Sequence, residues 1–124
     1  MGEEELLRFR IRFSVQAGQD AVEAAHSLLE FTASPDVARE LHQLFYREAG
    51  KLSTLPDRYA VVERESALWG MPVRRVLVRR WHLYYAIDQE QENEEGPLVI
   101  ILFLWPAMAE PVTREQAQQI QGNQ

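Results

Sequence analysis

Residues 73–88 read Val-Arg-Arg-Val-Leu-Val-Arg-Arg-Trp-His-Leu-Tyr-Tyr-Ala-Ile-Asp, and the prediction of the fold starts from this stretch. It is rich in β-branched and aromatic residues, which suit a pleated, half-buried surface. Because it is too long for one strand, it predicts two strands joined by a turn near Arg79-Arg80. Successive side chains of a strand point to opposite faces. The second strand should therefore carry Trp81, Leu83, Tyr85 and Ile87 on one face, and His82, Tyr84 and Ala86 on the other.

Downstream, residues 98–105 form a continuous apolar run, Leu-Val-Ile-Ile-Leu-Phe-Leu-Trp, bounded by Pro97 and Pro106. A run of this kind predicts a strand that is central in its sheet or buried on both faces. The acidic stretch Asp88 to Pro97 joins this strand to the preceding one. Its many like charges predict a solvated, mobile connection.

Upstream, apolar and polar residues alternate over residues 6–15, which predicts a strand with one face in the core. Two amphipathic helices should follow. The first begins near Asp20 as N-cap and runs to about Thr32. The second begins at Ser34-Pro35-Asp36, a favourable N-terminus, and ends near Thr54. The apolar stripe predicted for the first helix consists of Val22, Ala25, Leu28, Leu29 and Thr32.

The predicted fold class is α+β with the order β-α-α-β-β-β, in which a helical hairpin packs on one face of a small, mostly antiparallel sheet. We expect a single domain over residues 1–109 and a partly disordered C-terminal tail over 110–124, where Glu115 to Ile120 could add one helical turn. The other sheet face should carry the arginines and aromatics. The buried face is predicted to place Phe9, Ile11, Phe13, Leu83, Tyr85, Ile101 and Phe103 against Leu29, Leu41, Leu44 and Phe45.

The composition narrows the class of protein. Of the 124 residues, 46% are hydrophobic and 26% are charged, and no cysteine is present for disulfides or thiolate chemistry. The longest apolar run is too short for a bilayer, and the acidic N-terminus lacks signal-peptide features, so we expect a cytoplasmic protein without a membrane span. The net charge of −6 weakly disfavours broad binding to phosphate backbones. We expect no metal and no cofactor.

The order of elements and the central hairpin resemble the RelE/ParE superfamily of toxins from bacterial type II toxin–antitoxin systems. The resemblance covers roughly residues 6–109 and rests on order and spacing together. Its matching segments are Leu52 to Pro56, Gly70 to Tyr85 and Leu98 to Leu104. One departure concerns the end of the last strand, where this family usually has a His followed by Arg. Here Trp105 to Ala109 supply no base or cation.

The resemblance implies three functions. The favoured one is a ParE-like toxin that binds a protein target, DNA gyrase by family analogy, and is neutralised by a cognate antitoxin. The second is a RelE-like endoribonuclease acting on ribosome-bound mRNA, against which the acidic net charge and the scarcity of Lys and His weigh. The third is a degenerate, non-toxic homologue that only binds a partner. A homodimer and a toxin–antitoxin hetero-oligomer are both compatible with these functions.

The candidate partner-binding residues are Arg74, Arg75, Arg79, Arg80 and Trp105. Arginine contacts carboxylates and phosphates through a planar, bidentate fork, and Lys51 is the only lysine among the 13 basic residues. If the protein is a nuclease, the same four arginines would supply charge, and His82 and Tyr84 would transfer protons. Tyr85 faces the opposite way and belongs to the core. The alternative is that the arginines form a solvated face paired with glutamates.

Overall fold

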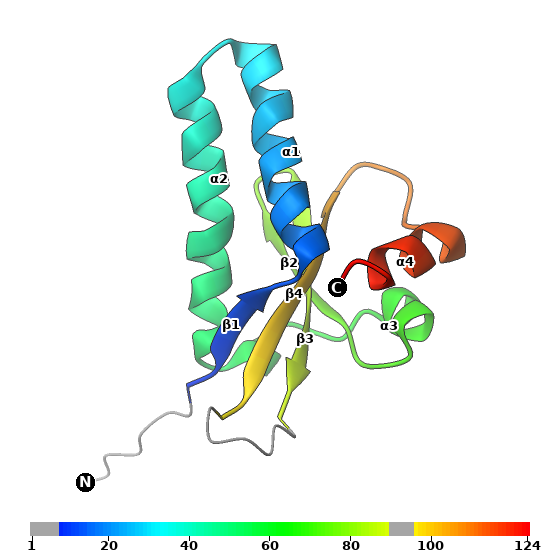
Figure 1. Ribbon diagram of the computed structural model, residues 1–124. Helices are drawn as coiled ribbons and strands as arrows, with labels where there is room; N and C mark the ends of the chain where they lie inside the picture. The colour runs from blue at the N-terminus through cyan, green and yellow to red at the C-terminus, as the bar shows by residue number, and fades with distance from the viewer. Residues whose placement is uncertain (1–7, 90–95) are drawn as a thin grey trace, which may run out of the picture.

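The computed structural model describes residues 8–89 and 96–124 and has the predicted α+β architecture (Figure 1). The helices are α1 (Val15–Thr32), α2 (Pro35–Gly50), α3 (Glu63–Trp69) and α4 (Arg114–Gln121), with short 3₁₀ turns η1 (Lys51–Ser53) and η2 (Pro56–Arg58). The strands are β1 (Arg10–Phe13), β2 (Arg74–Val78), β3 (Trp81–Asp88) and β4 (Leu98–Pro106). In the described part of the chain, no helix is both long and apolar enough to cross a membrane.

The four strands form one sheet in the order β1-β4-β3-β2. β4 pairs parallel with β1 and antiparallel with β3, which in turn pairs antiparallel with β2. The sheet is therefore mostly antiparallel, as predicted. The apolar run at 98–105 lies in β4, between two neighbours and buried along most of its length. This explains why its sequence shows no alternation.

The central hairpin also forms as predicted. Val78 pairs with Trp81, so the turn consists of Arg79 and Arg80 alone. Arg79 has φ 58°, in the left-handed region that two-residue hairpin turns require. Alternation holds along β3, because Leu83 and Tyr85 enter the core on one face. Tyr84 and Ala86 enter a second core on the opposite face.

The helical hairpin of α1 and α2 covers the first face, and α1 differs from the prediction in its start and its stripe. Its N-cap is Ser14, whose hydroxyl accepts a hydrogen bond from the Ala17 amide at 3.0 Å, and Asp20 lies inside the helix. The buried stripe is Ala17, Ala21 and Ala24, whereas Val22 is 55% exposed and Leu29 is only partly buried. Alanines have no bulk beyond Cβ, so α1 approaches the sheet closely.

The second helix begins as predicted, with Ser34 as N-cap accepting a hydrogen bond from the Val37 amide and with Pro35 in the first turn. Leu41 and Phe45 are buried beneath it. Ile11, Phe13 and Leu44 pack against the same core but keep part of their surface exposed. Phe13 also stacks on Tyr46, with ring centroids 4.1 Å apart.

The opposite sheet face is covered, which the sequence did not predict. Figure 1 shows α3 and α4 together on this side, away from the α1–α2 pair. Val112, Ala117 and Ile120 are buried there, because α4 packs against this face of the sheet. The C-terminal segment was predicted to be a partly disordered tail, whereas residues 112–124 are folded onto the second core. Thr113 and Gln116 form a reciprocal capping box at the start of α4. The Gln121 side chain donates to the Leu68 carbonyl at 3.1 Å and ties α4 to α3.

Phe103 was predicted to belong to the first core but lies on the opposite face of the sheet. Tyr84 pairs with Phe103 and Tyr85 with Ile101, so Leu102 is an extra residue in β4. This bulge breaks the alternation, and both Leu102 and Phe103 belong to the second core. Ile101 keeps the predicted side. The centre of the acidic connection predicted to be mobile, residues 90–95, lies outside the described residues.

Candidate functional site

The structure divides the predicted site residues among three places. Arg79, Arg80 and Trp105 line one open groove. Arg75, His82 and Tyr84 line a smaller hollow, to which Trp105 also contributes. Arg74 belongs to neither. The four arginines therefore do not form one site, although they lie within seven residues of sequence.

Arg74 has a structural role. Its guanidinium donates hydrogen bonds to the backbone carbonyls of Asp57, at 3.0 Å, and Tyr59. The hydroxyl of the neighbouring Tyr85 donates to the Pro56 carbonyl, and burial raises the Tyr85 pKa to about 12. Both side chains thus hold the segment around η2 against the sheet. Tyr85 is fully buried, as predicted for a core residue.

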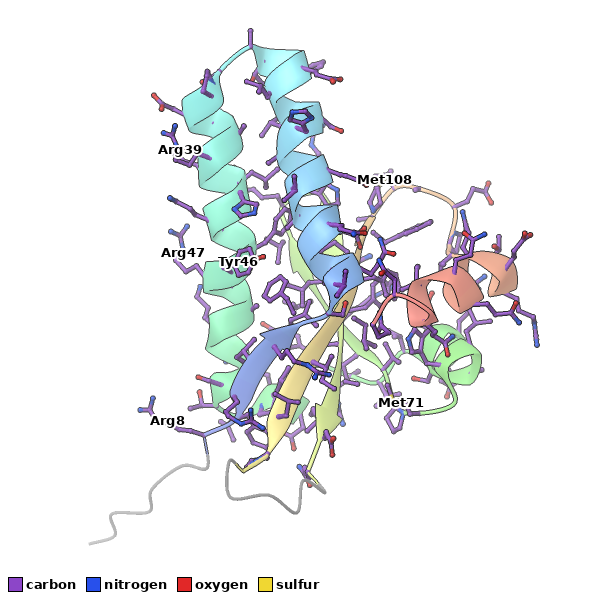
Figure 2. The ribbon with its side chains drawn as sticks, viewed as in Figure 1. Arg8, Arg39, Tyr46, Arg47, Met71 and Met108 are labelled. Carbon is purple, nitrogen blue, oxygen red and sulfur yellow. The ribbon has the colours of Figure 1, made fainter. Side chains whose placement is uncertain are left out.

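The larger concavity, here called the apolar groove, has a volume of about 1100 Å³ and runs between the helical hairpin and the β2–β3 turn. Six residues define it: Leu28, Phe31, Val37, Arg79, Arg80 and Trp105. Met108, from the loop after β4, also lines it and lies beside α1 in Figure 2. Phe31 is 88% exposed and Met108 95% exposed. Large apolar side chains clustered at an open groove are typical of a surface that a partner covers.

The walls of the apolar groove carry opposite charges. Arg79 and Arg80 stand on the wall formed by the β-hairpin, whereas Asp20, Glu23 and Glu40 stand on the walls formed by α1 and α2. Glu23 and Glu40 are exposed at the rim. Only the arginines could be predicted as site residues from the sequence, because the acidic residues lie far away along the chain.

Asp20 lies deeper in the same groove and is held by the sheet. Its carboxylate accepts hydrogen bonds from the Leu104 amide at 3.0 Å and from the Gln16 side chain at 2.8 Å. Burial raises the pKa of Asp20, and these hydrogen bonds oppose the rise only in part. This residue therefore shapes the groove wall and closes the edge of β4, where β1 has already ended.

The smaller concavity, here called the polar hollow, has a volume of about 370 Å³. It is defined by Arg64, Glu65, Arg75, His82, Tyr84 and Trp105. The Arg75 guanidinium donates to the Tyr84 hydroxyl at 3.3 Å. Glu65 is only 4% exposed and forms an ion pair with Arg64, with 3.2 Å between nitrogen and oxygen.

The hollow combines cationic groups with groups able to transfer protons. Burial, together with the Arg75 charge, lowers the pKa of His82, which favours the neutral imidazole that can accept a proton. Burial raises the pKa of Tyr84, so its hydroxyl keeps its proton. The Tyr84 ring stacks on Phe103, with centroids 4.4 Å apart. This packing fixes the hydroxyl at the margin of the second core.

Sequence reasoning missed Arg64 and Glu65 because it left residues 57–72 without a helix. The signal was present, since Gly70 ends α3 in a left-handed C-cap with φ 72°. Phe31 was missed as well: it lies outside the apolar stripe predicted for α1, and no sequence pattern placed it at a groove.

Within residues 8–89 and 96–124, no group of three or more His, Asp or Glu side chains is placed to hold a metal ion. Comparison with models of known protein families and with curated protein sequences gives no match to this chain.

Proposed function

We propose that this protein is the toxin-type component of a type II toxin–antitoxin system, ParE-like in acting by binding a protein target. A cognate antitoxin would neutralise it, and both would work in the cytoplasm. One observation carries the proposal: Arg79, Arg80 and Trp105, three of the five predicted partner-binding residues, line a single open apolar groove. By family analogy the target is DNA gyrase.

The chemistry of the groove favours a protein over a nucleic acid. Exposed Phe31 and Met108 offer apolar anchors of the kind that hold protein segments. Glu23 and Glu40 on the helix walls would repel a phosphate backbone, and so would the net charge of −6.

The polar hollow supports a second candidate, a RelE-like endoribonuclease. Arg75 could hold a phosphate, a neutral His82 could accept the 2′-hydroxyl proton, and Tyr84 could donate one to the leaving oxygen. The third candidate, a non-toxic homologue, would use the apolar groove alone to bind its partner.

Inducible expression in bacteria separates these candidates when growth, DNA integrity and mRNA integrity are followed together. The proposal expects growth arrest with gyrase-type DNA damage, and relief when the antitoxin is co-expressed. Arg79→Glu plus Arg80→Glu should abolish the arrest, while His82→Ala plus Arg75→Ala should keep it. Arrest with mRNA loss that needs His82 would overturn the proposal in favour of the nuclease, and unaffected growth would favour the non-toxic homologue.

A matched control guards against a general effect of charge. Arg39 and Arg47 are exposed on α2, and in Figure 2 both point away from α1. Arg39→Glu plus Arg47→Glu changes the net charge by the same amount as the groove variant. The control loses the Arg39–Asp36 surface pair, which contributes little to stability. It should retain growth arrest.

A further inference from the structure

We infer that the apolar groove binds an amphipathic helix of a protein partner, whose apolar ridge is flanked by acidic side chains on one side and basic side chains on the other. The inference rests on the proposed partner-binding function and specifies the chemistry of that partner. Arginines taken alone would favour an acidic partner segment. Because the groove has walls of both charges, its partner needs acidic side chains on one flank and basic side chains on the other.

The length of the groove follows from α1. Its lining residues recur at helical spacing, from Asp20 through Glu23, Ser27 and Leu28 to Phe31. This is one continuous face of about three turns, and eleven residue steps at 1.5 Å give a wall about 16 Å long. A partner helix of about the same length would align with this wall and pack side chain against side chain.

The backbone at the floor of the groove excludes an added strand. The Leu104 amide already donates to Asp20 at 3.0 Å, and the Ala107 amide donates to the Arg80 carbonyl at 2.8 Å. Trp105 pairs with His82 of β3. A strand added here would leave its own amides without partners, which is costly when they are buried. A helix satisfies its backbone internally, so it fits a groove that offers only side chains.

The opposite charges of the walls fix the flanks of this helix. The flank that faces the β-hairpin meets Arg79 and Arg80, and the flank that faces the helical hairpin meets Glu23 and Glu40. Like charges juxtaposed across an interface repel and exclude wrong partners. A helix that is acidic on both flanks would be attracted by the arginines at one wall and repelled by the glutamates at the other.

The test is a selection from a display library built on one helix of a small stable bundle, which supplies the helical conformation in advance. The helix of about 14 residues carries a fixed apolar ridge, and its flanking positions vary among Glu, Lys and Gln. Selection on the wild-type protein should enrich sequences with acidic residues on one flank and basic residues on the other.

Charge reversal provides the decisive comparison. Selection on Glu23→Lys plus Glu40→Lys should enrich helices that are acidic on both flanks. Glu30→Lys plus Glu115→Lys makes the same change of net charge at exposed acids outside the groove, and it should give the wild-type pattern. Thermal unfolding of each variant verifies that the fold is intact.

A second pair of variants locates the binding site. Phe31→Ser should raise the dissociation constant of a selected helix at least tenfold. Val22→Ser, at another exposed apolar residue of α1 outside the groove, should leave it unchanged.

Three results would overturn the inference. In the first, selection enriches no helix. In the second, the groove variant Glu23→Lys plus Glu40→Lys and the control variant Glu30→Lys plus Glu115→Lys select helices with the same flank charges. The third is a dimer in sedimentation that Phe31→Ser dissociates and selected helices do not displace, which would make a second copy the occupant. Growth arrest by the wild-type chain together with any of these would leave the proposed function standing while the helix is rejected.

Discussion

Ser14 and Asp20 show how single side chains complete the sheet. β1 ends at Phe13, and beyond it no strand among the described residues pairs with this edge of β4. The Ser14 amide donates to the Ile101 carbonyl at 2.9 Å, and its hydroxyl donates to the Leu102 carbonyl at 2.8 Å. Further along α1, Asp20 accepts a hydrogen bond from the Leu104 amide. Polar side chains at the start of α1 thus replace the missing strand, and this role is invisible in the periodicity of the sequence.

The raised pKa of Asp20 gives a prediction for stability against pH. Because the folded pKa lies above the model value of 3.8, the folded state binds this proton more tightly than the unfolded state. The stability that protonated Asp20 contributes is therefore fully present below pH 3.8 and is lost as pH rises through the pKa of the folded state. Asp20→Asn keeps an acceptor for Leu104 without the buried charge. As pH rises, the unfolding free energy of the wild type should fall relative to that of Asp20→Asn. Urea unfolding of both proteins between roughly pH 3.5 and 7 measures this difference. A wild-type protein that gains on the variant over this range would show that the charged hydrogen bond outweighs burial.

At the scale of elements, α1 packs through alanines where the sequence suggested larger residues. Ala17 and Ala21 are fully buried, and the larger Val15 and Val22 face outward at 55% exposure. The helix face that contacts the sheet is therefore rotated about the helix axis relative to the predicted stripe. The physical cause is close approach, because a helix that leans directly on β4 leaves room only for small side chains.

Close approach predicts that Ala21 tolerates no enlargement. Ala21→Leu should lower the free energy of unfolding by about 1–3 kcal/mol through overpacking. Val22→Leu, at the next residue and exposed, should change it by less than about 0.5 kcal/mol. Chemical denaturation measures both. Equal effects would show that α1 does not contact the sheet through the alanine stripe.

The second element with a testable role is α4. Ile120 is 7% exposed against the second core. Ile120→Ala should destabilise the protein by about 2–4 kcal/mol, while Gln119→Ala on the exposed side should change stability by less than about 0.5 kcal/mol. Were both variants equally stable, residues 110–124 would behave as the loose tail that the sequence suggested.

At the scale of the molecule, both faces of the sheet are covered, so binding has to use the margins. The apolar groove opens between the helical hairpin and the β2–β3 turn, and the polar hollow opens between α3 and the sheet. Trp105 and Pro106 line both. The indole of Trp105 donates to the Glu110 carbonyl at 2.8 Å and supports the loop that separates the two concavities.

This arrangement changes which arginines should govern association. Arg75 and Arg79 are both predicted partner-binding residues, but Arg75 lies in the polar hollow and Arg79 at the apolar groove. Arg79→Ala plus Arg80→Ala should slow association with a groove-bound helix about tenfold at low salt, because exposed charges mainly steer encounter. Stopped-flow kinetics at two salt concentrations measure this, with Arg75→Ala as the control expected to match the wild type. A larger loss from Arg75→Ala would move the binding site to the hollow.

Sequence patterns were enough to predict the α+β class, the hairpin turning at Arg79-Arg80, the buried strand at 98–105 and the start of α2. These depend on local patterns: alternation, a continuous apolar run and a Ser-Pro-Asp cap. The assignment of Arg74, Arg75, Arg79, Arg80 and Trp105 to partner binding stays a prediction. Three features became visible only in the folded chain: Arg74 holds a loop against the sheet, a bulge at Leu102 turns Phe103 to the second core, and α3 and α4 cover that core. The tertiary structure alone placed Glu23 and Glu40 across from the arginines, because contacts between distant segments depend on how the layers pack and leave no local period in the chain.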